Sequence, residues 1–273
     1  MCPELHGFSN PLSPKGKARI VGGVPWYYST ANVTIRYKAD PQEVKKLLPE
    51  PFEVSETEPA VVSCAFASQL SFSEEDKDLL VTNPERAQYK ECGLQVRCRF
   101  KGVEGQRAAY IWVDKDWAAF RGWFYGWPKK VGRIEFAFDK PHLYALNKAL
   151  GKVGPGTRFG AYLEAHGERL FTAAIKLTRQ ITPKELPASG KFYQINHWPS
   201  LDINSKKPLV HQVETAVSGS GVHGEIWAAE AESLIFTDSS LEEIGAIKPV
   251  ELIDAYYTTG GHVMKGTEVA HQY

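Results

Sequence analysis

Two adjacent lysines end an aromatic segment, Gly122-Trp123-Phe124-Tyr125-Gly126-Trp127-Pro128-Lys129-Lys130-Val131-Gly132. Pro128 fixes its own φ angle and favours extended backbone at Trp127, while the glycines permit tight bends. The two cations are therefore expected on a stiff turn beside apolar surface. If one lysine points into an apolar pocket, desolvation lowers its pKa, and the charge of its neighbour lowers that pKa further. For charges about 6 Å apart at an effective dielectric constant of about 20, the repulsion is about 2.8 kcal/mol, or about two pKa units.

A lysine with a lowered pKa has a specific chemistry. Its neutral amine attacks a ketone, and the resulting protonated Schiff base withdraws electrons from the neighbouring carbon. Most lysine pairs are simply solvated on turns, so the aromatic residues and the Pro-Lys-Lys-x-Gly ending are what favour a catalytic role here.

The lysine segment resembles the acetoacetate decarboxylase family, whose Schiff-base lysine and cationic neighbour lie in a Pro-Lys-Lys-x-Gly sequence. Acetoacetate decarboxylase is the established example of a lysine activated by adjacent positive charge. The resemblance implies that Lys129 forms the Schiff base and that Lys130 lowers its pKa. Tyr89-Lys90-Glu91-Cys92-Gly93 is similar to the family's Tyr-x-Glu-x-Gly segment, which implies that Glu91 transfers protons or orients the carbinolamine. The resemblance covers roughly residues 25 to 270.

Further site residues are placed by the same resemblance. Tyr28 and Tyr256 fall where the family's N-terminal and C-terminal segments approach the active site, and Arg121 and Trp127 flank the lysine turn; all four are expected to contact substrate. The family arginine before the first strand is missing, since that stretch reads Tyr27-Tyr28-Ser29-Thr30. Ser63-Cys64 replaces a second family glutamate. The Schiff-base residues are thus retained in a pocket that is expected to carry less charge.

The hydrophobic pattern predicts a β-rich chain. Strands are expected at residues 31–37, 60–66, 94–100, 108–113, 133–138, 159–165, 170–177, 209–217 and 224–236. Short helices are expected at 40–48, capped by Asp40, and at 114–120. Residues 248–257 fit either a helix or a strand, and Ser218-Gly219-Ser220-Gly221 is predicted to be a turn. Together with the resemblance, this pattern implies an α+β, β-rich single domain over residues 26–273, in which a bent antiparallel sheet closes into a barrel or cone with helices outside. Residues 1–25 are expected to form a surface arm.

Composition narrows the possible partners and cofactors. The 32 basic and 32 acidic residues balance, and no basic stripe is present, which argues against a nucleic-acid partner. The sequence has no stretch long and apolar enough to span a bilayer, no secretion signal and no Cys-x-x-Cys spacing, so a cytoplasmic location is expected. The eight histidines show no metal-binding spacing, and no nucleotide fingerprint occurs, so we expect no metal and no cofactor. The family resemblance implies a homo-oligomer.

The expected function is that of a carbon–carbon lyase that acts on a small oxo acid or ketone through a Lys129 Schiff base. The same iminium ion would support either of two reactions. These are decarboxylation of a 3-oxo acid, and aldol addition or dehydration of a 2-oxo acid such as pyruvate. Two alternatives remain open at this point. The chain could be a noncatalytic barrel that binds a small apolar ligand, or a biosynthetic cyclase or hydratase that uses the same iminium.

Overall fold

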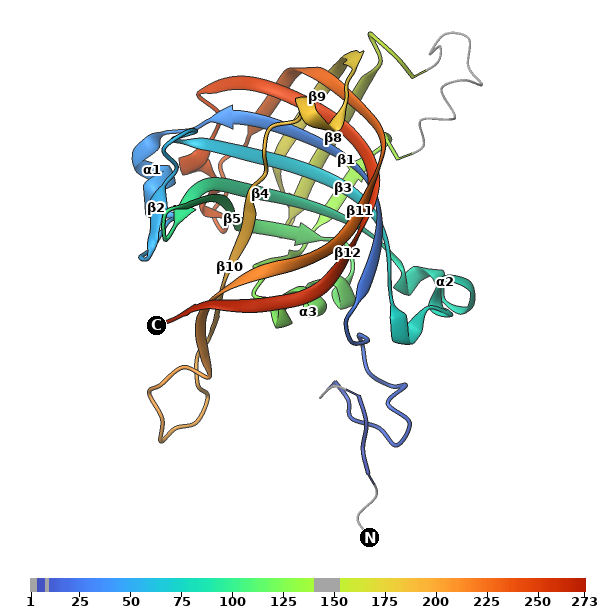
Figure 1. The fold of residues 1–273 in the computed structure, drawn as a ribbon. Coiled ribbons are helices and arrows are strands. Elements are labelled where there is room, and N and C mark those ends of the chain that lie inside the picture. Colours follow the sequence, from blue (N-terminus) through green and yellow to red (C-terminus); the bar gives the residue numbers. More distant parts are fainter. Residues whose placement is uncertain (1–3, 8–9, 140–152) are drawn as a thin grey trace.

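A single mixed sheet of twelve strands organises residues 4–7, 10–139 and 153–273, which the computed structural model describes (Figure 1). The strands are β1 (Trp26–Lys38), β2 (Phe52–Val54), β3 (Val61–Ser73), β4 (Gln88–Phe100), β5 (Val103–Val113), β6 (Lys129–Val131), β7 (Arg133–Phe136), β8 (Arg158–Ala165), β9 (Glu168–Gln180), β10 (Lys191–Trp198), β11 (Val210–Phe236) and β12 (Glu251–Gln272). The α-helices are α1 (Pro41–Lys46), α2 (Leu79–Thr82) and α3 (Asp116–Phe124), and short 3-10 helices occur at Glu74–Asp76, Pro84–Arg86, Pro183–Glu185 and Glu243–Ile247.

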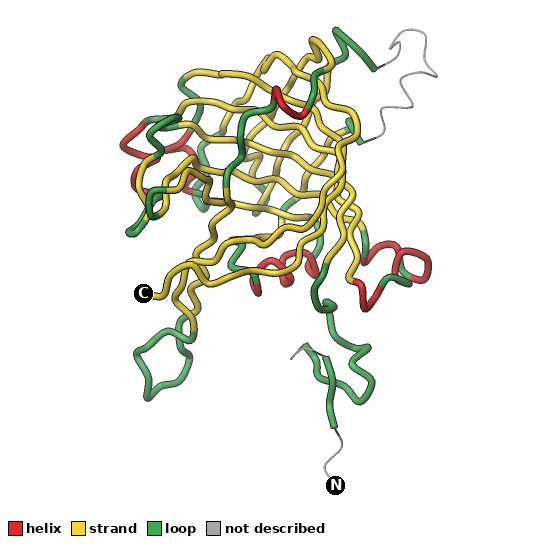
Figure 2. Tube along the Cα trace, viewed as in Figure 1, coloured by secondary structure: helices red, strands yellow, loops and turns green. Residues whose placement is uncertain are grey.

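The sheet closes on itself, as predicted. Strand β10 pairs with β5 on one side and with β11 on the other, so the order β10-β5-β4-β3-β1-β12-β11 forms a ring. Strands β9, β8 and β7 continue the sheet beyond β11. The helices lie outside the strands (Figure 2). The sheet is mixed and not purely antiparallel, because β5 pairs in parallel with both β6 and β10.

Several predicted elements are confirmed, and others are longer than the sequence pattern indicated. Helix α1 is capped by the Asp40 side chain, which accepts a hydrogen bond from the Gln42 backbone N–H. The two strands predicted at 209–217 and 224–236 are a single strand, β11, and the ambiguous C-terminal segment is strand β12. The turn predicted at Ser218–Gly221 is wrong. That segment remains part of β11, and the register of β11 against β12 shifts there, as it does at a β-bulge.

One face of β1 packs in the hydrophobic core, and the other face lines a groove. Val33, Ile35 and Tyr37 are buried in the main hydrophobic core. The alternate residues of β1 point the other way and line a groove that neighbouring strands extend, because successive side chains of a strand face opposite sides. These groove-lining residues of β1 are Tyr28, Thr30, Asn32, Thr34 and Arg36.

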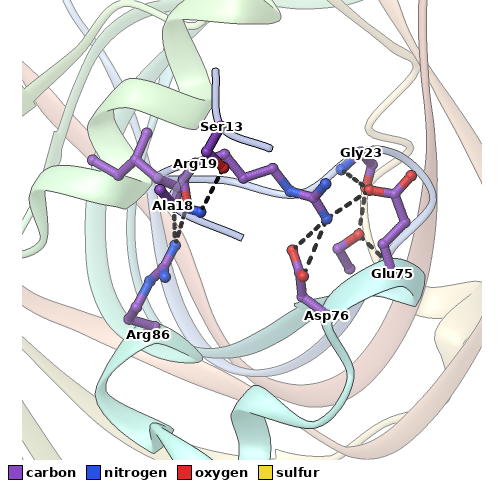
Figure 3. A network of polar contacts seen from close by, with 9 residues as sticks. Ser13, Ala18, Arg19, Gly23, Glu75, Asp76 and Arg86 are labelled. Atoms are coloured by element: carbon purple, nitrogen blue, oxygen red, sulfur yellow. Dashed lines mark hydrogen bonds and ion pairs between the residues drawn. The ribbon is translucent and has the colours of Figure 1, made fainter. Parts of the chain in front are cut away.

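The segment before β1 is attached to the chain between β3 and β4 through charged contacts (Figure 3). The Arg19 guanidinium pairs with Asp76 at 3.1 Å and with Glu75 at 2.9 Å. Arg86 donates a hydrogen bond to the Arg19 carbonyl oxygen at 3.1 Å. The expected surface arm is thus held against the domain around Arg19.

The cysteines that the structure describes form no disulfide bond. Cys64, Cys92 and Cys98 are buried free thiols, whereas Cys2 lies outside the described residues. Among the helices that the structure describes, none has the length and apolar character required to cross a membrane.

Candidate active site

A sharp turn after helix α3 positions Lys129 at the start of β6. Gly126 has a φ of +69°, a conformation that favours glycine, and it reverses the chain after the helix. The Trp127 N–H then donates to the Gly122 carbonyl oxygen at 3.0 Å, and β6 pairs with the buried strand β5, where Lys129 lies opposite Ile111. A Cβ atom on Gly122 would lie 2.4 Å from Lys129 Cδ, so this glycine makes room for the lysine side chain.

Lys129 is buried and forms an ion pair with Glu91. Its side chain is 7% exposed, and its Nζ atom lies 2.7 Å from Glu91 Oε2. Nζ also lies 5.2 Å from the centre of the Tyr89 ring. Burial lowers the pKa of Lys129 most strongly, and the Arg121 charge lowers it further, while Glu91 opposes both effects. The result is an amine that loses its proton more readily than a solvated lysine does.

Arg121 is the cation that acts on Lys129. Its side chain is buried in an aromatic cage, with the guanidinium carbon 4.2 Å from the Trp26 ring centre and 5.2 Å from that of Tyr28. The Nη1 atom donates to Ser71 Oγ at 3.1 Å. The buried Nη2 atom has no hydrogen-bond partner among the described residues. Arg121 therefore lines the Lys129 cavity and has one buried donor group that makes no hydrogen bond among the described residues.

The structure places Lys130 outside this cavity, in contrast to its predicted role. Its Nζ atom forms an ion pair with the buried Glu242 and lies 5.0 Å from the Trp112 ring centre. Residues 129 and 130 face opposite sides of β6 because side chains alternate along a strand. The predicted electrostatic contribution of Lys130 to the pKa of Lys129 is replaced by that of Arg121.

The cavity around Lys129 has a volume of about 340 Å³. Three of the predicted binding residues line it, namely Tyr28, Arg121 and Trp127. The Tyr28 ring stacks on the His262 imidazole, with ring centres 4.6 Å apart and planes 1° from parallel. Burial lowers the pKa of His262, and the Glu91 charge partly offsets that effect. The wall thus combines charged, phenolic and imidazole groups around the lysine.

Tyr256 is not brought to Lys129. It lines a separate part of the groove, and its hydroxyl group donates to Asp254 Oδ2 at 3.1 Å. Burial, followed by the Asp254 charge, raises the pKa of Tyr256 to about 12. Strand register explains this position, because Tyr256 pairs with Thr34 of β1, whereas His262 pairs with Tyr28. His262, six residues further along β12, therefore occupies the position expected for Tyr256.

Sequence reasoning missed several cavity residues. Gln95 lies four residues after Glu91 on β4, and Phe192 comes from β10, a strand that was not predicted. The period of two along β4 could have identified Gln95, since alternate residues share a face with Glu91. No local signal connects Phe192 to the site, because the ring of strands brings β10 there.

The arrangement can form and stabilise an iminium ion. A buried amine and a carboxylate 2.7 Å away are groups that imine chemistry uses. Within residues 4–7, 10–139 and 153–273, no group of three or more His, Cys, Asp or Glu side chains is arranged to hold a metal ion.

Comparisons with known proteins give a family match and similar solved structures. The sequence model of the acetoacetate decarboxylase family matches residues 9–273. A comparison with curated protein sequences gave no significant match. The structure is similar to that of the enduracididine biosynthesis enzyme MppR, solved with the condensation product of pyruvate and imidazole 4-carboxaldehyde; the identity is 26%, the TM-score is 0.84, and the similarity covers 97% of each chain.

Two further solved structures share the fold. An acetoacetate decarboxylase-like enzyme from Sphingomonas wittichii RW1 is 25% identical, with a TM-score of 0.89 over 98% of this chain and 100% of that chain. The acetoacetate decarboxylase from Legionella pneumophila is 17% identical, with a TM-score of 0.74 over 93% of this chain and 89% of that chain. The last similarity concerns the fold alone.

Proposed function

The chain belongs to the acetoacetate decarboxylase family, and from that premise we propose that it is an enzyme in which Lys129 forms a Schiff base with a small 2-oxo acid such as pyruvate. The observation that carries the proposal is the buried Lys129 amine, 2.7 Å from Glu91 and subject to the Arg121 charge. The similarity to MppR, solved with a condensation product of pyruvate, supports the choice of donor.

Schiff-base formation uses the Lys129–Glu91 pair directly. Glu91 accepts a proton from the Lys129 ammonium group, and the neutral amine then attacks the keto carbon of the oxo acid. The carbinolamine oxygen leaves as water after protonation, which yields the iminium ion. The lowered pKa of Lys129 favours the first step.

Arg121 fits the carboxylate of a 2-oxo acid. In such a substrate the carboxylate is bonded directly to the carbon that joins the lysine nitrogen, so a cation beside Lys129 can reach it. The buried Nη2 atom of Arg121 lacks a hydrogen-bond partner among the described residues, and a carboxylate oxygen would supply one. This arrangement offers an alternative to the missing family arginine before the first strand.

The iminium leads to carbon–carbon bond formation. Loss of a proton from the methyl carbon of the bound pyruvate gives an enamine, whose carbon attacks the carbonyl carbon of an aldehyde. The aldehyde oxygen takes up a proton to become a hydroxyl group. Loss of a second proton from the former methyl carbon, with departure of the protonated hydroxyl group as water, gives an unsaturated product. Hydrolysis of the imine consumes one water molecule and regenerates Lys129. Glu91 and the neighbouring His262 are the groups available for these proton transfers.

Decarboxylation of a 3-oxo acid is the second candidate, because the same iminium accepts the electrons that carbon dioxide leaves behind. The similarity to MppR, solved with a condensation product of pyruvate, is the observation that favours condensation over decarboxylation.

Borohydride trapping tests the proposal. The intact mass is measured after treatment with pyruvate and, separately, with acetoacetate, for the wild type, Lys129→Ala and Lys130→Ala. We expect a covalent adduct that retains the pyruvate carboxylate in the wild type and in Lys130→Ala, and none in Lys129→Ala. An adduct with acetoacetate that lacks its carboxylate would support decarboxylation instead. Absence of any adduct across a wider panel of carbonyl compounds would indicate a noncatalytic binding protein.

A further inference from the structure

A second cavity adjoins the Lys129 cavity along the polar face of the sheet. It has a volume of about 300 Å³, and Gln95 and Phe192 line both cavities. A third hollow shares Glu91 with the Lys129 cavity and Asn32 with the second cavity, and it too is lined by Gln95 and Phe192. The groove is therefore continuous from the reactive lysine to the second cavity.

Strand register sets the length of this groove. Glu91, Gln95 and Arg97 lie on the same face of β4, at alternate positions. At about 3.3 Å per residue, the Cα atoms of Glu91 and Gln95 are about 13 Å apart. An aldehyde that reacts at Lys129 therefore needs an extended body to reach the second cavity, and this body crosses the aromatic Phe192.

The charged groups of the second cavity are paired. Arg97 Nε lies 2.9 Å from Glu58 Oε2, and Arg36 Nη1 lies 2.8 Å from Glu58 Oε1. Arg36 Nε also contacts Asp254 Oδ1 at 3.0 Å. The two guanidinium groups of the lining are thus paired with Glu58 in the lining and with Asp254 beside it, so a charged ligand would have to compete for groups that are already paired.

Uncharged polar side chains supply the remaining surface of the second cavity. The Ser63 hydroxyl group and the amides of Gln95 and Gln106 make no side-chain hydrogen bond within the described part of the chain, although Ser63 is 8% and Gln106 is 7% exposed. An amide offers both donors and an acceptor. Such groups bind a ligand that has donors and acceptors of its own but carries no charge.

We propose that this second cavity is an acceptor site that holds the uncharged, hydrogen-bonding end of an extended aldehyde, while the aldehyde carbonyl reaches the Schiff base at Lys129. An amide or a hydroxyl-bearing group has the required chemistry. The inference rests on the proposed function for its reaction, but its binding can be measured without that reaction.

Unreactive cinnamyl alcohols test the acceptor site. Three versions carry a carboxamide, a carboxylate or a trimethylammonium group at the para position, and calorimetry measures the Kd of each. We expect the carboxamide to bind at least about tenfold more tightly than either charged version, because a charged group finds no free partner of opposite sign. Equal affinity for all three would overturn the proposal.

Two substitutions of Gln106 and a control test whether this residue causes the tighter binding of the carboxamide. Gln106→Leu should remove most of the carboxamide advantage, and Gln106→Glu should shift the preference toward the trimethylammonium version. Gln42→Leu changes the same side chain on the exposed surface of α1 and should alter nothing. A carboxamide advantage that survives Gln106→Leu would overturn the site as placed.

Pyruvate trapping at Lys129, followed in parallel, separates the two proposals. Trapping without an end-group preference contradicts only the acceptor site. A preference without trapping contradicts the Schiff-base function and leaves the binding site supported.

Discussion

Lys129 and Lys130 are adjacent in the chain, yet they pair with different carboxylates on opposite sides of β6. Lys129 pairs with Glu91 in the cavity, and Lys130 pairs with Glu242 outside it. The cation that lowers the pKa of Lys129 is therefore Arg121, eight positions earlier on helix α3. This separation of roles allows each residue to be tested independently.

Replacement of Arg121 should affect both the lysine and the substrate. In Arg121→Met, loss of the guanidinium charge should raise the pKa of Lys129, so the pH above which pyruvate is trapped should move upward. Loss of a charged hydrogen bond to the carboxylate should raise the apparent KM for pyruvate about 10- to 100-fold. Arg133→Met removes an exposed arginine and is the matched control. An unchanged pH profile would argue against Arg121 as the activating cation.

Replacement of Glu91 should separate imine formation from turnover. Since Glu91 raises the pKa of Lys129 against the other two effects, Glu91→Gln should lower that pKa, so the imine trapped at equilibrium should extend to lower pH, although it should form more slowly without the Glu91 base. The same variant loses its proton-transfer group, so kcat for condensation should fall about 10²- to 10⁴-fold. Trapping and turnover are measured across the same pH series. Turnover equal to that of the wild type would exclude Glu91 as the proton-transfer residue.

Lys130 should matter for stability and not for chemistry. Lys130→Met removes the cation that pairs with Glu242, which is buried at 4% exposure. The Glu242 carboxylate keeps the hydrogen bond from the Trp112 indole N–H at 3.3 Å. Lys130 itself is 41% exposed, which limits the loss. We expect the free energy of unfolding in urea to fall by about 1–2 kcal/mol. Loss of pyruvate trapping in a folded Lys130→Met protein would contradict this assignment.

Gly122 should be required for the position of Lys129. In Gly122→Ala the new methyl group meets Lys129 Cδ, so the lysine must leave its place beside Glu91, even though alanine favours helices by about 1 kcal/mol over glycine. We expect the rate of pyruvate trapping to fall at least about tenfold. Gly160→Ala on β8, where the nearest atom to a new Cβ is 3.8 Å away, is the control. Equal trapping rates in the two variants would refute the steric argument.

Local sequence identified the elements that depend on near neighbours. The cap at Asp40 and the helix before the lysine turn were accessible from short segments, and so were Lys129 and Glu91 as candidate site residues. Strand lengths were underestimated, because β11 and β12 pair with each other and with several other strands, and those distant partners keep bulged segments extended.

Sequence patterns were enough to indicate a β-rich chain with an unusual lysine pair and a separate glutamate motif. The pairing of distant strands was needed to show which cation faces Lys129, that His262 and not Tyr256 reaches the cavity, and that β10 brings Phe192 between two cavities. The physical reason is register. A shift of one residue along a strand moves a side chain to the opposite face, and the pairing of strands far apart in the chain sets that register.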